Sequence, residues 1–408
     1  MRAMYEPGRV VVTGMAVTTP DTADLLTFET NLRESRPSVG NTLAGFDWDQ
    51  RLATIAASDP EAGQRARRVG RTASRTLRIT LATAIEAAID AAIGASRTPE
   101  ARAIVVAGSN LQLDRAAKAQ EKFRTAPAYL SPRHGYEFYD THVMAVVAEA
   151  LDIRGPGLTV GGASASGNVA IATALDLIRC GRATSCLVVG PLPELSAMEL
   201  HALQAMGALS RTGQCHPFDR SANGFVPGEI CGAVVLECED AARNRGAVAL
   251  AEIAGACCVL GASHLPGPDA DGAYRAMEGA LRDARATLTE LDCISAHATG
   301  TQAGDRAECE ALHRFLGHRC GDVPVNAPKS LIGHGLQAAG IVELIALVLQ
   351  MRGGFIHGTA ALTDPIAEDL WLVGPATIAR PIRLGLSNSF GFGSIGTSIA
   401  VANMDIAA

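Results

Sequence analysis

The sequence predicts an α/β fold made of two similar halves. Short, continuous apolar runs, which are typical of strands buried on both faces, alternate with longer segments of helical periodicity along the 408 residues. Hydrophobic residues form 48% of the chain and charged residues only 19%, and the 42 glycines permit close packing between helices and strands. Because this length is more than twice that of a typical domain, we expect one duplicated fold or two domains.

The first elements follow this alternation. Residues 9–14 form an apolar run that ends in glycine, which predicts a buried strand. Ala, Arg and Leu recur at helical spacing over residues 63–97 and predict the first long helix, and residues 103–108 predict the next buried strand.

Residues 1–8 lack the apolar core of a signal peptide, and no run approaches the roughly 18 uninterrupted apolar residues of a membrane span. We therefore expect a cytoplasmic protein.

An internal repeat is predicted by two segments about half the chain apart. Residues 158–181 and residues 323–353 each consist of a short strand pattern, a glycine-containing turn and an apolar helix pattern. The first segment carries Ser164 at its turn, and the second carries Lys329 and His334. The alternative is two unrelated α/β halves with similar turns.

The two halves are expected to meet at a charged turn. Residues 239–246 are rich in Glu, Asp and Arg and lie between the apolar runs 232–238 and 249–255. This pattern predicts an N-terminal half over residues 1–240 and a C-terminal half over residues 241–408.

Charge and cysteine content exclude several functions. A net charge of −7 gives no electrostatic reason to bind nucleic acid or anionic membranes, and an aromatic content of 4% argues against a base-stacking surface. The ten cysteines are irregularly spaced and several lie in apolar runs, as expected of free thiols in a reducing cytosol. Cys180 and Cys186 have no partners at zinc-binding spacing, so no metal site is predicted.

Ser164 is the most informative residue, because the run 158–170 predicts a strand that turns sharply into a helix. Free backbone N–H groups and the helix dipole favour negative charge at such a position. A serine alkoxide forms far less readily than a thiolate, so Ser164 needs a strong adjacent base to act as a nucleophile. The plain alternative is that Ser164 is an ordinary helix N-cap.

Four motifs, one of which contains Ser164, resemble in their order, intervals and wording the ketosynthases of fatty acid and polyketide assembly. The four motifs are residues 163–167 around Ser164, 297–301, 329–334 and 387–393. Residues 216–220, 224–229 and 10–15 match as well, so the resemblance covers essentially the whole chain.

The resemblance implies a thiolase-like fold and a specific change at its centre. It implies two βαβαβαββ halves stacked in five layers (αβαβα), and a homodimer joined along a strand edge. In this family the position of Ser164 carries the nucleophilic cysteine that accepts the acyl chain.

The resemblance also implies roles for the polar residues around Ser164. His297 and His334 would hydrogen-bond the thioester carbonyl of a malonyl group as it loses carbon dioxide. Lys329 and Glu343 would form a buried ion pair that orients His334 and tunes the local field. Hydrogen-bond donors at an enolate oxygen lower the barrier, typically by about 3 to 4 kcal/mol each. The plain alternatives are satisfied core histidines and an unrelated surface lysine with a solvent-facing glutamate.

The remaining motif residues are assigned in the same way. Thr299 and Thr301 would bind the phosphopantetheine arm of a carrier protein, and Phe392 would gate the pocket unless it is a plain core aromatic. The turn that contains Gly391 and Gly393 would supply a backbone N–H to an oxyanion hole together with that of residue 164. Asp305 and Glu308 follow the family pattern and are expected to be structural, binding backbone or an ion.

Several residues depart from the family pattern near the acyl-binding wall. They are Gly161, Gly162, Ala165, Gly167, Asn168, Ala298, Gly335 and Gln337. These changes argue against a pocket for a long acyl chain.

Three functions are compatible with this pattern. The first is decarboxylation of malonyl carrier protein to acetyl carrier protein without condensation, similar to the ketosynthase-like decarboxylases of polyketide β-branching cassettes, which supply a hydroxymethylglutaryl-synthase-like enzyme. The second is a Ser164-dependent acyltransferase or thioesterase, with His297 or His334 as base. The third is a non-catalytic partner subunit similar to chain-length factors, although such subunits tend to lose the histidines.

No cofactor is expected beyond the phosphopantetheine of the carrier protein, and no metal. The expected partners are an acyl carrier protein, a second copy of the chain and other cassette enzymes. Arg65, Arg67, Arg68, Arg71 and Arg75 are candidates for contact with an acidic carrier, and a solvated helix face is the alternative. The choice between malonyl and methylmalonyl groups, and the carrier and pathway served, stay open.

Overall fold

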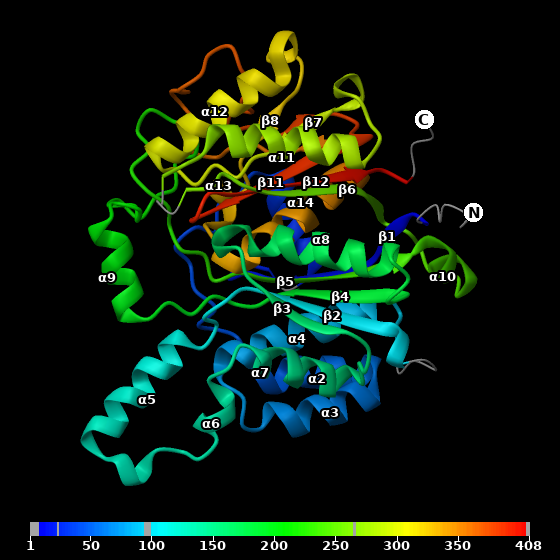
Figure 1. The fold of residues 1–408 in the computed structure, drawn as a ribbon, viewed down its shortest axis with the longest axis vertical. Coiled ribbons are helices and arrows are strands. Elements are labelled where there is room, and N and C mark those ends of the chain that lie inside the picture. Colours follow the sequence, from blue (N-terminus) through cyan, green and yellow to red (C-terminus); the bar gives the residue numbers. More distant parts are fainter. Residues whose placement is uncertain (1–7, 23, 94–98, 264–266, 405–408) are drawn as a thin grey trace.

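The chain folds into alternating layers of helices and sheet (Figure 1). The computed structural model describes residues 8–22, 24–93, 99–263 and 267–404. Residues 1–7, in which the sequence predicts no signal peptide, lie outside the described residues.

Ten strands form one continuous sheet in the described part of the chain, in the order β3-β2-β4-β5-β1-β6-β12-β11-β7-β8. When the strands of each half are numbered from its own first strand, the two halves have the same strand order. In both halves the first strand lies at the centre of the sheet and the third at its outer edge. The strands are β1 (Val10–Thr18), β2 (Arg102–Ala107), β3 (Gly157–Val160), β4 (Ser185–Gly190), β5 (Cys231–Cys238), β6 (Ala251–Leu260), β7 (Cys293–Ser295), β8 (Val325–Asn326), β11 (Leu384–Gly391) and β12 (Ile395–Ala402), with β9 (Phe355–Ile356) and β10 (Ile378–Ala379) as a separate pair.

The two halves of the sheet form two layers, and helices on both outer faces and between the halves bring the total to five. In the first half they are α1 (Leu25–Arg33), α2 (Trp48–Ser58), α3 (Pro60–Gly70), α4 (Arg75–Asp90), α5 (Leu113–Thr125), α6 (His134–Glu137), α7 (Thr141–Leu151), α8 (Ser166–Arg179), α9 (Ala197–Ala205) and α10 (Glu239–Asn244). In the second half they are α11 (Ala270–Asp283), α12 (Gln302–Leu316), α13 (Lys329–Ile332) and α14 (Ala339–Gly353). Helices α4 and α7 cover one outer face, α11 and α12 cover the other, and α8 and α14 lie between the two halves of the sheet (Figure 1).

The duplicated, five-layered α/β fold is thus confirmed. The two segments that predict the repeat occupy equivalent places: β3 leads through a turn into α8, and β8 leads through α13 into α14. Both central helices contribute to one core, in which Ile171 and Leu175 of α8 pack with Ile345 and Leu347 of α14. The turns that carry Ser164 and His334 are therefore fixed to the most buried helices of the fold.

Helix α14 is the apolar helix that the pattern of residues 323–353 predicts. Residues 336–353 are long and apolar enough to cross a membrane by length and composition. However, 78% of this stretch is buried inside the fold, where α14 packs between the two halves of the sheet. Its apolar character is explained by burial in the core.

Two predicted elements differ from the structure. The single long helix expected over residues 63–97 is two helices, because α3 ends at Gly70, which packs against the Trp48 ring, and Ser74 caps α4 by accepting a hydrogen bond from the backbone N–H of Leu77. Residues 94–97 lie outside the described residues. The charged turn expected over residues 239–246 contains the short helix α10.

Candidate active site

Ser164 lies in a strained turn between β3 and α8. Ala163, directly before it, has a φ angle of 51°, in the left-handed region that side chains disfavour. Ser166 fixes the turn, because its Oγ accepts a hydrogen bond from the Gly162 backbone N–H at 2.8 Å and donates to the Ala163 carbonyl at 2.7 Å. The N-cap of α8 is Ala165, and no side-chain cap is present. The alternative that Ser164 is an ordinary N-cap is therefore wrong.

A second strand holds the same turn from the opposite half of the molecule. Ser389 on β11 donates a hydrogen bond to the Ser164 carbonyl at 3.0 Å. Gly391 passes so close to the turn that a Cβ atom on it would lie 2.2 Å from the Gly162 carbonyl oxygen. The position of Ser164 thus depends on contact between the two halves.

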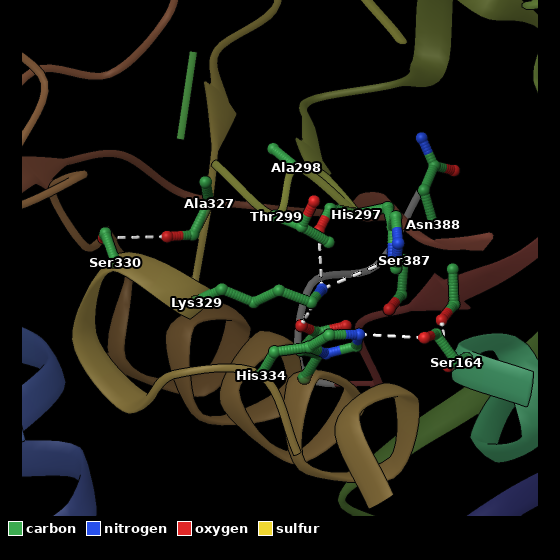
Figure 2. A network of polar contacts seen from close by, with 12 residues as sticks. Ser164, His297, Ala298, Thr299, Ala327, Lys329, Ser330, His334, Ser387 and Asn388 are labelled. Carbon is green, nitrogen blue, oxygen red and sulfur yellow. Dashed lines mark hydrogen bonds and ion pairs between the residues drawn. The ribbon is translucent and has the colours of Figure 1, made fainter. Parts of the chain in front are cut away.

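His334 is the direct partner of Ser164 (Figure 2). Its Nε2 lies 2.8 Å from Ser164 Oγ, and its side chain is fully buried. The His334 backbone N–H donates to the Val226 carbonyl at 2.7 Å, and the Phe225 ring packs edge-on against the imidazole at 5.0 Å. Burial, and then the positive charge of Lys329, hold the pKa of His334 well below its ordinary value, so the ring is neutral near pH 7.

His297 is oriented by a buried ion pair. Lys329 Nζ lies 2.5 Å from Glu343 Oε1, and both side chains are inaccessible to solvent. The same ammonium group donates to the His297 carbonyl at 2.6 Å and lies 3.4 Å from His297 Nδ1. The structure therefore confirms the predicted Lys329–Glu343 pair, and the alternative of a surface lysine is wrong. The expectation that the pair orients His334 is also wrong, because the ammonium group contacts His297.

This arrangement selects one tautomer of His297. An ammonium group has three donors and no acceptor, so the contact with Nδ1 requires Nδ1 to accept. Burial, followed by the positive charge of Lys329, lowers the pKa of His297 well below its ordinary value, so the neutral ring carries its proton on Nε2. His297 thus offers an N–H donor, and its ring centroid lies 5.7 Å from that of His334.

The loop that carries His297 is anchored by two buried carboxylates on α12. Glu308 accepts hydrogen bonds from the backbone N–H groups of His297 and Ala298 at 2.9 and 2.7 Å. Asp305 accepts from those of Thr299, Gly300 and, at 2.8 Å, Phe218. Asp305 and Glu308 therefore bind backbone, as expected.

A cavity of about 950 Å³ joins these residues. Ser164, His297, His334, Thr299, Thr301, Gly391 and Phe392 line it, whereas Lys329 and Glu343 lie behind the histidines and Gly393 is not on its wall. Thr299 and Thr301 share a hydrogen bond of 2.9 Å between their hydroxyls. Phe392 is 46% exposed, so the alternative of a plain core aromatic is wrong.

Of the residues that depart from the family pattern, only one lines this cavity. Gln337 lines it, and its Nε2 donates to the Pro191 carbonyl at 3.3 Å. Asn168 is buried away from the wall and donates to the Ser387 carbonyl at 3.0 Å. The wall therefore gains one amide side chain from these changes, and Asn168 supports the neighbouring strand.

Three residues that the sequence interpretation missed take part in the site. Ser389 holds the Ser164 turn, Phe225 packs on His334, and Phe390 packs on His297 with ring centroids 5.4 Å apart. All three lie inside motifs that the sequence singles out, at residues 224–229 and 387–393. The motifs therefore indicate that these three positions belong to the site, but the sequence does not show where their side chains point.

No metal centre is found in the described part of the chain, where no group of three or more His, Cys, Asp or Glu side chains could hold an ion. All ten cysteines are free thiols, including the exposed Cys180 and the buried Cys186.

Comparison with known proteins agrees with this geometry. Residues 8–242 match the family "Beta-ketoacyl synthase, N-terminal domain", and residues 250–363 match "Beta-ketoacyl synthase, C-terminal domain". The polyketide biosynthesis malonyl-ACP decarboxylase PksF of Bacillus subtilis (strain 168) is 35% identical over 309 residues, which is 74% of each chain.

Solved structures of similar proteins have the same fold. The ishigamide ketosynthase/chain length factor superposes with a TM-score of 0.83 at 26% identity, covering 97% of this chain and 99% of the other. A type II polyketide synthase acyl carrier protein in complex with its ketosynthase, AntDE:AntF, gives a TM-score of 0.80 at 26% identity, covering 98% of this chain and 100% of the matched chain.

Proposed function

The chain belongs to the beta-ketoacyl synthase family, and we propose that it converts malonyl-acyl carrier protein to acetyl-acyl carrier protein by decarboxylation, without condensation. The observation that carries this proposal is a neutral N–H donor, His297, held by Lys329 beside a serine at the turn where the family is expected to carry its cysteine. The site keeps groups that stabilise an enolate and offers no thiol to accept an acyl chain.

Ser164 lacks the support that a catalytic nucleophile needs. In a serine–histidine pair the histidine accepts the hydroxyl proton, and a third group on its other nitrogen holds the ring in the required tautomer. Within the described residues, no hydrogen-bond partner reaches Nδ1 of His334. Acylation of Ser164 is therefore not part of the proposed reaction.

The proposed reaction balances with water as the only co-reactant. The bond between C2 and the carboxylate carbon of the malonyl group breaks, carbon dioxide leaves, and the electron pair passes to the thioester oxygen of an enolate. His297 Nε2–H and the Ser164–His334 pair stabilise that oxygen, which is typically worth several kcal/mol to the transition state. Water then gives a proton to C2, which leaves an acetyl thioester and hydroxide.

The relatives support this choice of reaction. PksF, with 35% identity, is named for malonyl-ACP decarboxylation in polyketide biosynthesis. By analogy we place the present chain in a polyketide β-branching cassette, where a hydroxymethylglutaryl-synthase-like enzyme consumes the acetyl group. Its free cysteines suit a reducing cytoplasm.

The proposed substrate arrives on the phosphopantetheine arm of a carrier protein. Thr299 and Thr301 line the cavity on the side of α12 and offer hydroxyls to the amides of that arm. On the surface, Arg67 and Arg71 of the α3 region are exposed, whereas Arg65, Arg68 and Arg75 form surface ion pairs with Glu61, Glu149 and Glu229. We propose this arginine cluster as the contact for an acidic carrier.

A homodimer is proposed through the edge of the sheet. Strand β3 is the last strand of the first half and pairs only with β2 among the described strands. Leu158 on β3 is 40% exposed, and an unpaired apolar edge favours pairing with another chain. Light scattering on the purified protein tests this, with a dimer expected and a monomer contradicting it.

Intact-mass spectrometry of malonyl carrier protein incubated with the enzyme tests the proposed function. We expect the carrier to lose the mass of carbon dioxide while the enzyme mass stays unchanged. A stable acyl adduct on the enzyme, abolished in Ser164→Ala, would instead identify a serine acyltransferase or thioesterase. Conversion only after addition of an active ketosynthase would identify a partner subunit. Either of these outcomes refutes the proposal.

A further inference from the structure

The contact between Ser164 and His334 has two possible directions, and they predict different chemistry. If Nε2 of His334 accepts the hydroxyl proton, Ser164 is activated as a nucleophile. If Nε2 carries the proton, Ser164 Oγ accepts it at 2.8 Å, and the serine hydrogen is free to point elsewhere.

The surroundings of Nδ1 decide between these directions. In the neutral ring one nitrogen carries the proton, and Nδ1 is buried with no hydrogen-bond partner among the residues that the structure describes. A proton on Nδ1 would be an orphaned buried N–H, which is rarer in proteins than an unsatisfied acceptor. The ring therefore carries its proton on Nε2 and donates to Ser164.

The hydroxyl hydrogen of Ser164 then faces the cavity. The Oγ atom already accepts from His334, and the Ser164 side chain lines the same cavity as His297. A hydroxyl can donate one hydrogen bond while it accepts another, and a donor that is itself hydrogen-bonded is strengthened by polarisation.

We propose that Ser164 is a catalytic hydrogen-bond donor to the enolate oxygen, and that His334 is the positioning residue that orients its hydroxyl. This inference rests on the proposed decarboxylation and assigns its second donor. His297 contacts the oxygen directly through Nε2–H, whereas His334 acts through Ser164. The serine thus replaces a nucleophile with a donor.

The tautomer of His334 can be measured without any substrate. A long-range ¹H–¹⁵N correlation spectrum of protein labelled with ¹⁵N-histidine distinguishes the two neutral tautomers, and His334→Gln assigns the signal among the ten histidines. We expect a proton on Nε2. A proton on Nδ1 overturns the inference, whether or not the protein decarboxylates malonyl groups.

A double-mutant cycle tests the division of roles. We expect kcat to fall roughly 10²-fold in Ser164→Ala and by a similar factor in His334→Ala, because each removes the same donor. Since the two residues act as one unit, the double variant should be no more than a few-fold slower than either single variant. Ser58→Ala, at an exposed position in α2, is the control.

Two results of the cycle would overturn the assignment. Unchanged or faster turnover in Ser164→Ala together with a large loss in His334→Ala would mean that His334 contacts the oxygen itself. Fully additive losses would mean that the two residues act separately. Absence of decarboxylation by the wild-type protein would instead refute the proposed function and leave the tautomer measurement as the test of the hydrogen-bond direction.

Discussion

Lys329 binds His297 at two points, with its Nζ 2.6 Å from the His297 carbonyl oxygen and 3.4 Å from Nδ1 of the ring. One ammonium group therefore fixes both the backbone and the tautomer of the residue that presents Nε2–H to the cavity. Glu343 Oε1 lies 2.5 Å from the same Nζ atom. Its negative charge balances that of Lys329, so the ammonium group can stay charged in a fully buried position.

Replacing Lys329 with methionine should lower both the stability of the fold and the rate of decarboxylation. Lys329→Met leaves Glu343 buried without its partner, so the free energy of unfolding should fall by about 3 to 5 kcal/mol. The kcat should fall roughly 10²-fold, because His297 is no longer held as an N–H donor. Urea unfolding and steady-state decarboxylation measure the two effects.

The double variant Lys329→Met/Glu343→Leu is the matched control. Replacing a buried ion pair by apolar residues of similar volume is often nearly neutral, so stability should return toward the wild-type value while kcat stays low. If kcat recovers together with stability, Lys329 serves the fold alone.

The close contact between Gly391 and the Ser164 turn leads to a second prediction. A Cβ atom on Gly391 would lie 2.2 Å from the Gly162 carbonyl, so Gly391→Ala must push β11 and the Ser164 turn apart. We expect a loss of about 1 to 3 kcal/mol in unfolding free energy and a roughly 10²-fold loss in kcat from the displaced turn. Gly374→Ala, with no atom within 4 Å of its added Cβ, should change neither quantity. Wild-type kcat in Gly391→Ala would show that the turn tolerates displacement.

The pH dependence follows from the two lowered histidine pKa values. Burial, and then Lys329, lower the pKa of both His297 and His334, so both rings stay neutral down to a pH well below 6.5 and take up a second proton, at Nδ1, only in more acidic solution. We expect the ratio of wild-type kcat to that of His297→Gln to stay constant between about pH 6 and pH 8. Other groups that titrate in this range affect both proteins equally, so their effect on kcat cancels in the ratio. Asp305 is one of them, because burial raises its pKa to about 7. A ratio that changes as the pH falls through 6.5 would mean that His297 titrates near its ordinary pKa.

Ser164→Cys should create an acyl-accepting group. Backbone N–H groups at the start of α8 favour a thiolate there, so an acyl thioester on the carrier should transfer its acyl group to Cys and release the carrier thiol. Intact mass should show one acyl group on the variant. The wild-type protein is the control, because its ten cysteines should stay unmodified under the same conditions. If the variant also stays unmodified, the turn is not an acylation site.

The sequence motifs located the candidate site, because their order and intervals resemble those of the ketosynthases. Ser164, His297 and His334 meet in the structure although they are far apart in the chain. The hydrogen bond from Ser389 to Ser164 joins residues 225 positions apart and depends on the stacking of the two halves, which local periodicity does not encode. The break between α3 and α4 was missed because helical spacing continues through it, and only the packing of Gly70 on Trp48 ends the first helix.

In the proposed reaction the site makes an enolate and protonates it on carbon without transferring an acyl group. A single turnover of malonyl carrier protein in deuterium oxide, followed by intact-mass spectrometry, distinguishes this reaction from acyl transfer. We expect acetyl carrier protein that contains one deuterium on its methyl group, and an enzyme of unchanged mass. Acyl-modified enzyme with free carrier thiol, or carrier that keeps its carboxylate, would rule the proposed reaction out.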